Sequence, residues 1–386
     1  MDPVKLALIG GALLVAGGVA IAGGLLPVEG AAAIAGRVWP VLVFVVSVTI
    51  VAELAARAGV FDVVAARLAL LARGRTALLW AMVVALAVVC TAFLSLDTTA
   101  VLLTPVVVAV ARANGLSPLP FAFTTVWLAN TASLALPVSN LTNLLAVHRL
   151  PSSDALSFVA LLAGPAGVAV VVTVLILWLR YRRRLRGRYP PGPLPRVADP
   201  LLFGMSAVVV GVMMPLLVSG LEPWIPATAA ALVLLSVFAW RSPTVIRFSL
   251  VPWQLVLFAS GLFLAAGVAA SAGVLDLVGR GLGVGTDLLS LWGVAGAGAV
   301  GANVGGNLPA YLALEPAAAD APSRLAALLV GVNAGPLITP WASLATLLWH
   351  ERLRAEGVEV PWRRFVLWGA LAAPLIVGLA VVPLAF

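Results

Sequence analysis

The chain has 386 residues, of which 62% are hydrophobic and only 10% are charged, and its formal net charge is +8. A soluble domain carries about 25% charged residues, so this composition excludes a soluble protein and predicts an all-α polytopic membrane protein in the lipid bilayer. The single cysteine, Cys90, excludes an internal disulfide and a multi-cysteine metal site. The basic residues lie in short loops between apolar segments, where they set orientation, so we expect no nucleic-acid partner.

Apolar stretches of membrane-spanning length lie at about 4–26, 38–58, 119–147, 156–180, 200–218, 224–240, 249–271, 323–349 and 364–385. The first lacks the cleavage site of a signal peptide, so we expect a retained span. Two further pairs, 76–96 with 98–112 and 287–305 with 308–320, each fit two full spans or one re-entrant hairpin. Arginines flank both ends of the first pair and aspartates both ends of the second, which favours hairpins. The expected architecture is about 9 full spans plus 2 hairpins.

Threading the chain in this way places the N-terminus in the cytoplasm and the C-terminus outside the cytoplasmic membrane. Four basic residues then lie outside: Arg37, Arg149, Arg280 and Arg324. The other basic residues face the cytoplasm, which is the distribution that sets the orientation of membrane proteins.

A polar run with a proline, residues 130–143, interrupts one apolar segment and recurs about two hundred residues later. The alignment of 126–145 with 330–348 matches Asn130 with Asn333, Pro137 with Pro340 and Asn140 with Ser343. A mid-span proline frees a backbone carbonyl, and paired interrupted segments in two halves point to the binding site of a transporter.

A second resemblance, between 41–64 and 255–278, extends the repeat, since both stretches end in Gly-Val-x-Asp. We therefore predict two inverted-topology repeats. The first covers 1–180, with a hairpin at about 76–112 and a broken helix at about 119–147. The second covers 224–386, with a hairpin at about 287–320 and a broken helix at about 323–349. A basic cytoplasmic linker and one inverting span occupy 181–223.

The hairpin tips carry the residues that we connect with ion coupling. Asp97, followed by Thr98 and Thr99, lies at the first tip, and an acid at membrane depth is a functional hypothesis by default. Asp97 also fits the N-cap of the next helix, so a purely structural role is the alternative. In the second hairpin, Asn307 is expected to lie where Asp97 lies in the first, with Asn303 before it.

The broken helices carry the expected substrate-binding side chains, because a cluster of amides and hydroxyls around two prolines favours site lining. These residues are Asn130, Thr131, Ser133, Ser139, Asn140, Asn143, Asn333, Thr339, Ser343 and Thr346. A single Ser or Thr more often bonds its own helix backbone, whereas one backbone carbonyl does not satisfy an Asn amide. No nucleotide, zinc or dinucleotide motif is present, so we expect no enzyme activity and no cofactor, and transport energy must come from an ion gradient or a separate partner.

Three stretches resemble the arsenical pump membrane proteins, the arsenite/antimonite efflux permeases of the ion transporter superfamily. They are LDTTAVLLTP (96–105), NTASLALPVSNLTNLL (130–145) and GPLITPWASLATLLWHERL (335–353). The resemblance implies two inverted repeats with re-entrant hairpins, shared with the divalent-anion:sodium symporters, and export of trivalent arsenic and antimony against proton influx, alone or with a soluble ATPase. It is also compatible with a homodimer.

The chain departs from that family where Asn130 replaces an acid and Leu337 replaces a lysine. These changes leave open whether protons or sodium are the coupling ion. They also leave two other cargoes open: sodium exchanged for protons, and a small anion such as a dicarboxylate. An anion site would recruit a cation, and the sequence shows no Lys or Arg deep within the membrane. The remaining alternative is a non-transporting receptor or anchor, against which the two matched polar breaks count.

Overall fold

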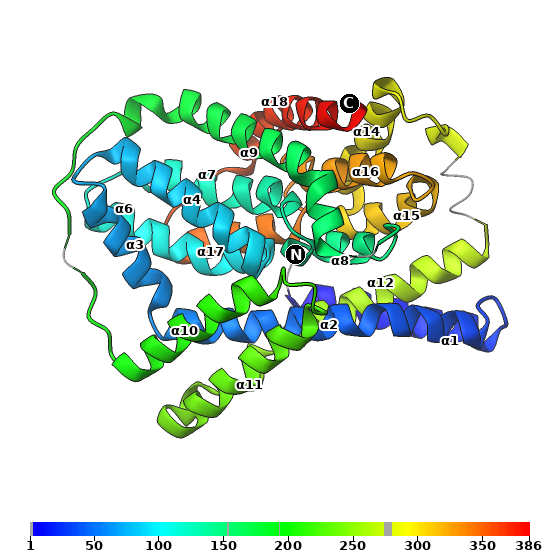
Figure 1. The fold of residues 1–386 in the computed structure, drawn as a ribbon, viewed down its shortest axis with the longest axis horizontal. Helices are drawn as coiled ribbons and strands as arrows, with labels where there is room; N and C mark the ends of the chain where they lie inside the picture. Colours follow the sequence, from blue (N-terminus) through cyan, green and yellow to red (C-terminus); the bar gives the residue numbers. More distant parts are fainter. Residues whose placement is uncertain (1–2, 153, 193, 274–279) are drawn as a thin grey trace.

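The computed structural model describes residues 3–152, 154–192, 194–273 and 280–386, and these residues form helices joined by short turns (Figure 1). The one β-type contact among them is an isolated bridge between Arg75 and Arg188. The predicted all-α architecture is confirmed. The Asp276 end of the second Gly-Val-x-Asp motif lies outside the described residues.

Helices make up most of the described residues in both predicted halves. The first half contains α1 (Pro3–Ala22), α2 (Val28–Arg57), α3 (Val60–Leu71), α4 (Thr76–Leu94), α5 (Leu96–Thr98), α6 (Thr104–Ala113), α7 (Pro118–Thr131), α8 (Leu141–Val147) and α9 (Ala155–Leu185). The rest contains α10 (Pro200–Leu216), α11 (Trp224–Arg241), α12 (Trp253–Ser271), α14 (Leu288–Gly305), α15 (Asn307–Ala318), α16 (Pro322–Ala334), α17 (Leu344–Ala355) and α18 (Trp362–Val381). The opposite orientation of the halves, and their limits at 180 and 224, remain predictions.

Within the described residues, eight helical segments are long and apolar enough to cross a membrane. Three of them, α4, 96–113 and α14, belong to the two predicted hairpins, and α1 and α10 are shorter apolar helices. The span predicted at 38–58 is too short, because α2 begins at Val28 and its 30 residues extend about 45 Å. Polar residues before Trp39 hid this extension, although Arg37 has an ion-pair partner within the protein.

The two hairpins turn through the same backbone conformation. Ser95 has φ 81° and ψ 160°, and Gly306 has φ 97° and ψ 156°. Positive φ suits glycine and is rare for serine, so the serine conceals the correspondence in the sequence. Ser95 therefore matches Gly306, and Asp97 matches Leu308. The expected equivalence of Asp97 with Asn307 is wrong by one residue.

Helices of one half pack against helices of the other. The helix α1 lies along α12, α2 along α11 and α9 along α18. The pair α1 and α12 approach backbone to backbone: a Cβ atom on Gly261 would lie 2.3 Å from the carbonyl oxygen of Gly10. This contact requires glycine at both positions, because only small residues let the backbones of membrane helices approach so closely.

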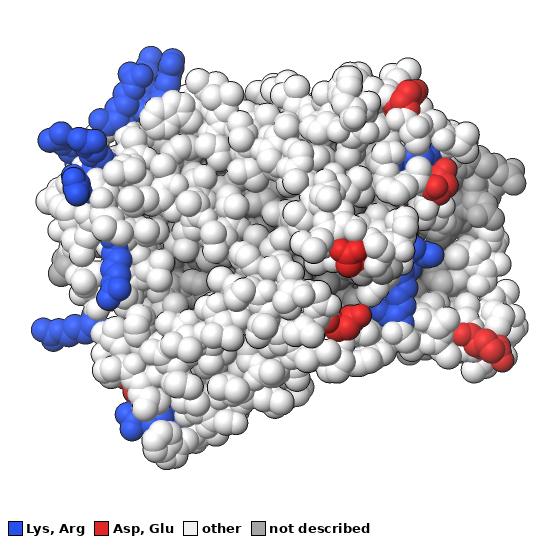
Figure 2. Space-filling model, viewed as in Figure 1, with Lys and Arg blue, Asp and Glu red and all other residues white. Residues whose placement is uncertain are grey.

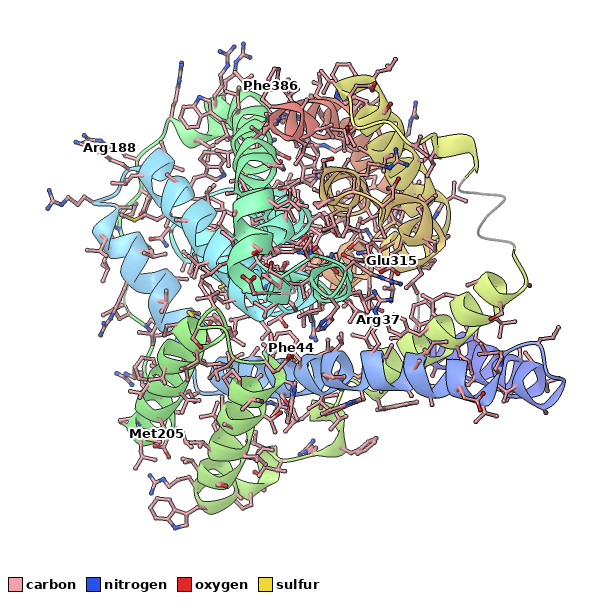
Figure 3. The ribbon with its side chains drawn as sticks, turned by 45° about the vertical axis from the view of Figure 1, so that its right-hand side comes forward. Arg37, Phe44, Arg188, Met205, Glu315 and Phe386 are labelled. Carbon is pink, nitrogen blue, oxygen red and sulfur yellow. The ribbon has the colours of Figure 1, made fainter. Side chains whose placement is uncertain are left out.

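Charge is sorted between the two ends of the molecule. Figure 2 shows Lys and Arg gathered at the left end, whereas the acidic residues lie mostly toward the right with fewer basic ones. In Figure 3, Arg188 lies toward the first end and Arg37 lies beside Glu315 toward the other. The sorting agrees with the charge pattern of the sequence, and the side of the membrane that each end faces stays a prediction.

Candidate functional site

Both broken helices lose their helical hydrogen bonding around a proline. Between α7 and α8 the chain forms two 3₁₀ turns, Ala132–Leu134 and Pro137–Ser139. Between α16 and α17 residues 335–343 are not helical, and this stretch includes Pro340. The predicted interruptions are present in the fold.

The side chain of Asn333 joins the two broken helices. Its Nδ2 donates to Asn143 Oδ1 at 2.7 Å, and its Oδ1 accepts from Asn140 Nδ2 at 2.7 Å and from Thr142 Oγ1 at 3.0 Å. Asn143 in turn donates to the carbonyl oxygens of Ser133 and Leu136. Because these buried amides satisfy one another, this crossing holds the two halves together and offers few free atoms to a substrate.

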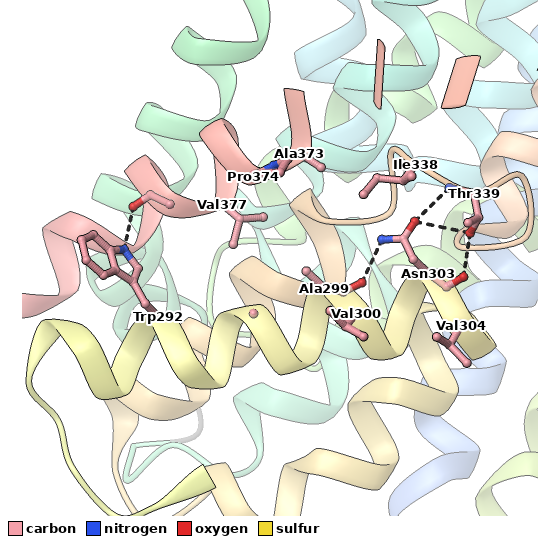
Figure 4. A pocket seen from close by; sticks show the side chains of 12 residues that line it. Trp292, Ala299, Val300, Asn303, Val304, Ile338, Thr339, Ala373, Pro374 and Val377 are labelled. Carbon is pink, nitrogen blue, oxygen red and sulfur yellow. Dashed lines mark hydrogen bonds between the residues drawn. The ribbon is translucent and has the colours of Figure 1, made fainter. Parts of the chain in front are cut away.

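A second network fixes the break of the other helix, as Figure 4 shows. Asn303 Nδ2 donates to the carbonyl oxygens of Ala299 and Gly335, while its Oδ1 accepts from Thr339 N at 2.9 Å. The hydroxyl of Thr339 donates to the Asn303 carbonyl at 2.8 Å. Asn303 and Thr339, both predicted to bind substrate, therefore bind each other.

Most of the predicted hydroxyl ligands also have protein partners. Thr131 donates to Trp127 O, Ser133 to Asn130 O, Ser139 to Ala92 O and Thr99 to Ser95 O. The backbone N–H of Thr98 donates to Ser95 Oγ at 3.4 Å, so Ser95, not Asp97, caps the helix. Asn307 accepts from Leu308 N at 2.9 Å.

Four predicted site residues carry a buried polar atom that has no hydrogen-bond partner in the described part of the chain. They are Asp97 Oδ1, Asn130 Oδ1, Ser343 Oγ and Thr346 Oγ1. In the alignment of the two broken helices, Asn130 matches Asn333, Ser343 matches Asn140, and Thr346 matches Asn143. Ser343 and Thr346 thus stand at the positions of the two amides that bond Asn333, and their shorter side chains leave a hydroxyl oxygen unpaired.

Asp97 lines a cavity of about 330 Å³ between the first hairpin, α2, α12 and α17. Its polar lining is Thr49, Glu53, Asp97, Thr98, Ser249, Gln254 and Arg352. Of these residues, the sequence predicted only Asp97 and Thr98 as part of the site. The available signal was an acid inside the apolar run of α2, since Glu53 pairs only loosely with Arg57, at 4.0 Å.

A second charged cluster was also missed, on the other hairpin. The side chain of Glu315 in α15 is only 5% exposed and pairs with Arg37 of α2 (Figure 3). It also pairs with Arg149, at 2.9 Å. The hydroxyl of Tyr311 donates to the same carboxylate at 3.2 Å. Two of the four arginines that the predicted topology places outside the cytoplasm thus share one buried acid.

The comparisons with known proteins agree with this fold. The family model described as CitMHS, citrate transporter, matches residues 1–346. The chain belongs to the CitMHS family. The arsenical pump membrane protein of Escherichia coli (strain K12) is 29% identical over 351 residues, covering 84% of this chain and 81% of the relative. That of Yersinia enterocolitica is 30% identical over 356 residues, with the same coverages.

The fold has a counterpart among solved structures. The crystal structure of the Alcanivorax borkumensis YdaH transporter superposes with a TM-score of 0.59 at 16% sequence identity, covering 91% of this chain and 86% of that one. The chain is therefore a multi-pass membrane transporter and not an enzyme, and the predicted relationship to the arsenical pump membrane proteins is confirmed.

Proposed function

We propose that the protein exports trivalent arsenic or antimony in exchange for protons, by alternating access around the hairpin tips and the broken helices. The observation that carries the proposal is Asp97, whose unpaired carboxylate oxygen lies at the first tip on the wall of a polar cavity. The relatives named arsenical pump membrane protein support this cargo. An acid at membrane depth is a suitable group to carry a coupling proton.

The chemistry of the available atoms suits an uncharged hydroxide. Trivalent arsenic in water is largely the neutral hydroxide, which hydroxyl and amide oxygens bind by hydrogen bonds. Asn130, Ser343 and Thr346 each supply one unpaired oxygen. Cys90 is a single buried thiol, so three-thiolate coordination is not available to this chain.

The test is transport into everted membrane vesicles with and without an imposed pH gradient. We expect Asp97→Asn to abolish proton-driven arsenite accumulation while the protein remains folded and inserted, because the amide cannot release a proton. Ser95→Gly is the matched control, since glycine occupies the same conformation at Gly306 and leaves Asp97 in place. Arsenite transport by Asp97→Asn at the normal rate contradicts the proposal.

A second cargo, a carboxylate anion, is favoured by one observation that the sequence did not offer. Arg352 lines the same cavity as Asp97 and supplies the cation that an anion site recruits. The family model is described as a citrate transporter, which supports this alternative. Citrate, arsenite, antimonite and sodium are compared in the same vesicles. Uptake of citrate that is lost in Arg352→Gln, with no arsenite uptake, decides for the anion.

A further inference from the structure

An apolar groove of about 520 Å³ runs between α14 and α18 and ends against the break of the second broken helix (Figure 4). Gly296, Ala299 and Val300 form one wall, and Ala373 and Val377 form the other. Ile338 and Thr339 close the inner end. The groove is separate from the cavity that contains Asp97, since the two share no lining residue.

The polar groups along this groove are already bonded to the protein. Asn303 and Thr339 bind each other, and Trp292 Nε1 donates to the carbonyl oxygen of Gly378 at 2.9 Å. A hydroxylated or charged solute would therefore give up its hydration in the groove without gaining new partners. The occupant that this lining favours is a hydrocarbon.

The groove is continuous with a surface of the kind that faces lipid. Val300 and Val304 of α14 are 66% and 75% exposed, and Leu371 and Leu375 of α18 are 58% and 57% exposed. Both α14 and α18 are among the helical segments able to span a membrane. In the bilayer, apolar side chains exposed on such helices lie against the acyl chains of the surrounding lipid.

We propose that this groove is a binding slot for one acyl chain of a membrane lipid, seated against the Ile338–Thr339 turn. The chain packs on the segment that interrupts the second broken helix, so a lipid becomes part of the packing around that break. This inference needs only the membrane location of the protein and is independent of the cargo proposed above.

The test uses the full-length protein in nanodiscs of phosphatidylcholine that contains a trace of the same lipid with a photoreactive diazirine in the chain. After illumination, peptide mapping locates the label. We expect label on the partly buried turn around Ile338 as well as on the outer face of α18 around Leu375. Bulk lipid reaches Leu375, which therefore serves as an internal reference.

Two substitutions fill the groove from opposite walls. A Cβ atom added at Gly296 or at Gly378 meets no other atom within 4 Å, so Gly296→Phe and Gly378→Phe place a ring in the empty space. Gly293→Phe is the matched control, because Gly293 lies on the same helix, has equal room and does not line the groove. Label at Ile338 should fall severalfold in both groove variants and stay unchanged in the control.

Two results overturn the proposal. One is the absence of label at Ile338 in the unmodified protein while Leu375 is labelled. The other is equal labelling of Ile338 in all variants, which means that the lipid reaches Ile338 without passing through the groove. If Gly296→Phe converts a dimer into monomers and Ile338 is unlabelled in the unmodified protein, the occupant is a second copy of the chain and the lipid slot is refuted.

Discussion

Replacing Glu315 by glutamine tests whether the second charged cluster holds three segments together. The change keeps the shape of the side chain and removes its charge. Arg37 and Arg149 then lose their shared ion-pair partner, and the hydroxyl of Tyr311 loses its charged acceptor. Removing one member of a buried ion pair costs about 3–5 kcal/mol. Because Arg37 and Arg149 are 28% and 45% exposed, water partly compensates them, and we expect the loss to be about 2–3 kcal/mol.

The assay is thermal and denaturant unfolding of the purified protein in a mild detergent. Glu356→Gln is the matched control. Glu356 pairs with Arg112 at 3.8 Å, and the side chains of Glu356 and Arg112 are 35% and 47% exposed. A surface pair of this kind contributes about 0–1 kcal/mol. Equal destabilisation by the two substitutions refutes the reasoning, because it leaves burial without an effect.

A double-mutant cycle separates the ion pair from other effects of the substitution. Arg149→Gln alone leaves the Glu315 carboxylate with Arg37, whereas the double variant removes both charges. We expect the two losses to be non-additive by about 1 kcal/mol or more, as for residues in one network. Additive losses mean that Glu315 and Arg149 do not interact in solution.

Two further predictions concern stability. Asn333→Ala leaves the buried polar groups of Asn140, Thr142 and Asn143 without their partner, and each unsatisfied group costs about 1–3 kcal/mol. In unfolding assays in detergent, it should therefore be far more destabilising than the matched Asn130→Ala, since the side-chain oxygen of Asn130 has no partner to lose. The backbone N–H of Ser157 is the main cause that lowers the pKa of Asp154 to about 2, so this cap should protect the start of α9 above about pH 4 and lose its effect as the pH falls toward 2. Hydrogen exchange of the first α9 amides measures it, and exchange that is independent of pH after correction for intrinsic rates contradicts the assignment.

The sequence predicted where the chain breaks, but it did not predict how the broken ends bond. Polar residues and a proline inside an apolar run are visible locally, so the interruptions near Pro137 and Pro340 could be placed. Asn333 finds its partners in Asn140 and Asn143, about 190 positions away, and no local pattern reports such a pairing. The fold was therefore needed to tell which predicted ligands bond one another and which keep an unpaired atom.

The remaining differences arise where a residue adopts a conformation or a pairing that its type does not favour. Ser95 takes a backbone conformation suited to glycine, which displaced the match between the hairpin tips by one residue. Arg37 lies within a spanning helix because Glu315 neutralises it, and this concealed the first turns of α2. Asn303 was recognised as a polar residue at membrane depth, although its hydrogen bonds are all made within the protein.

The close contact of α1 with α12 has a consequence for biogenesis. During synthesis α1 enters the membrane roughly 250 residues before its neighbour exists, and its glycine face must meanwhile rest against lipid or the insertion machinery. The first half therefore waits in an incomplete state until Gly261 arrives. Quality control that recognises unpaired membrane helices has its longest opportunity to act on this protein in that interval.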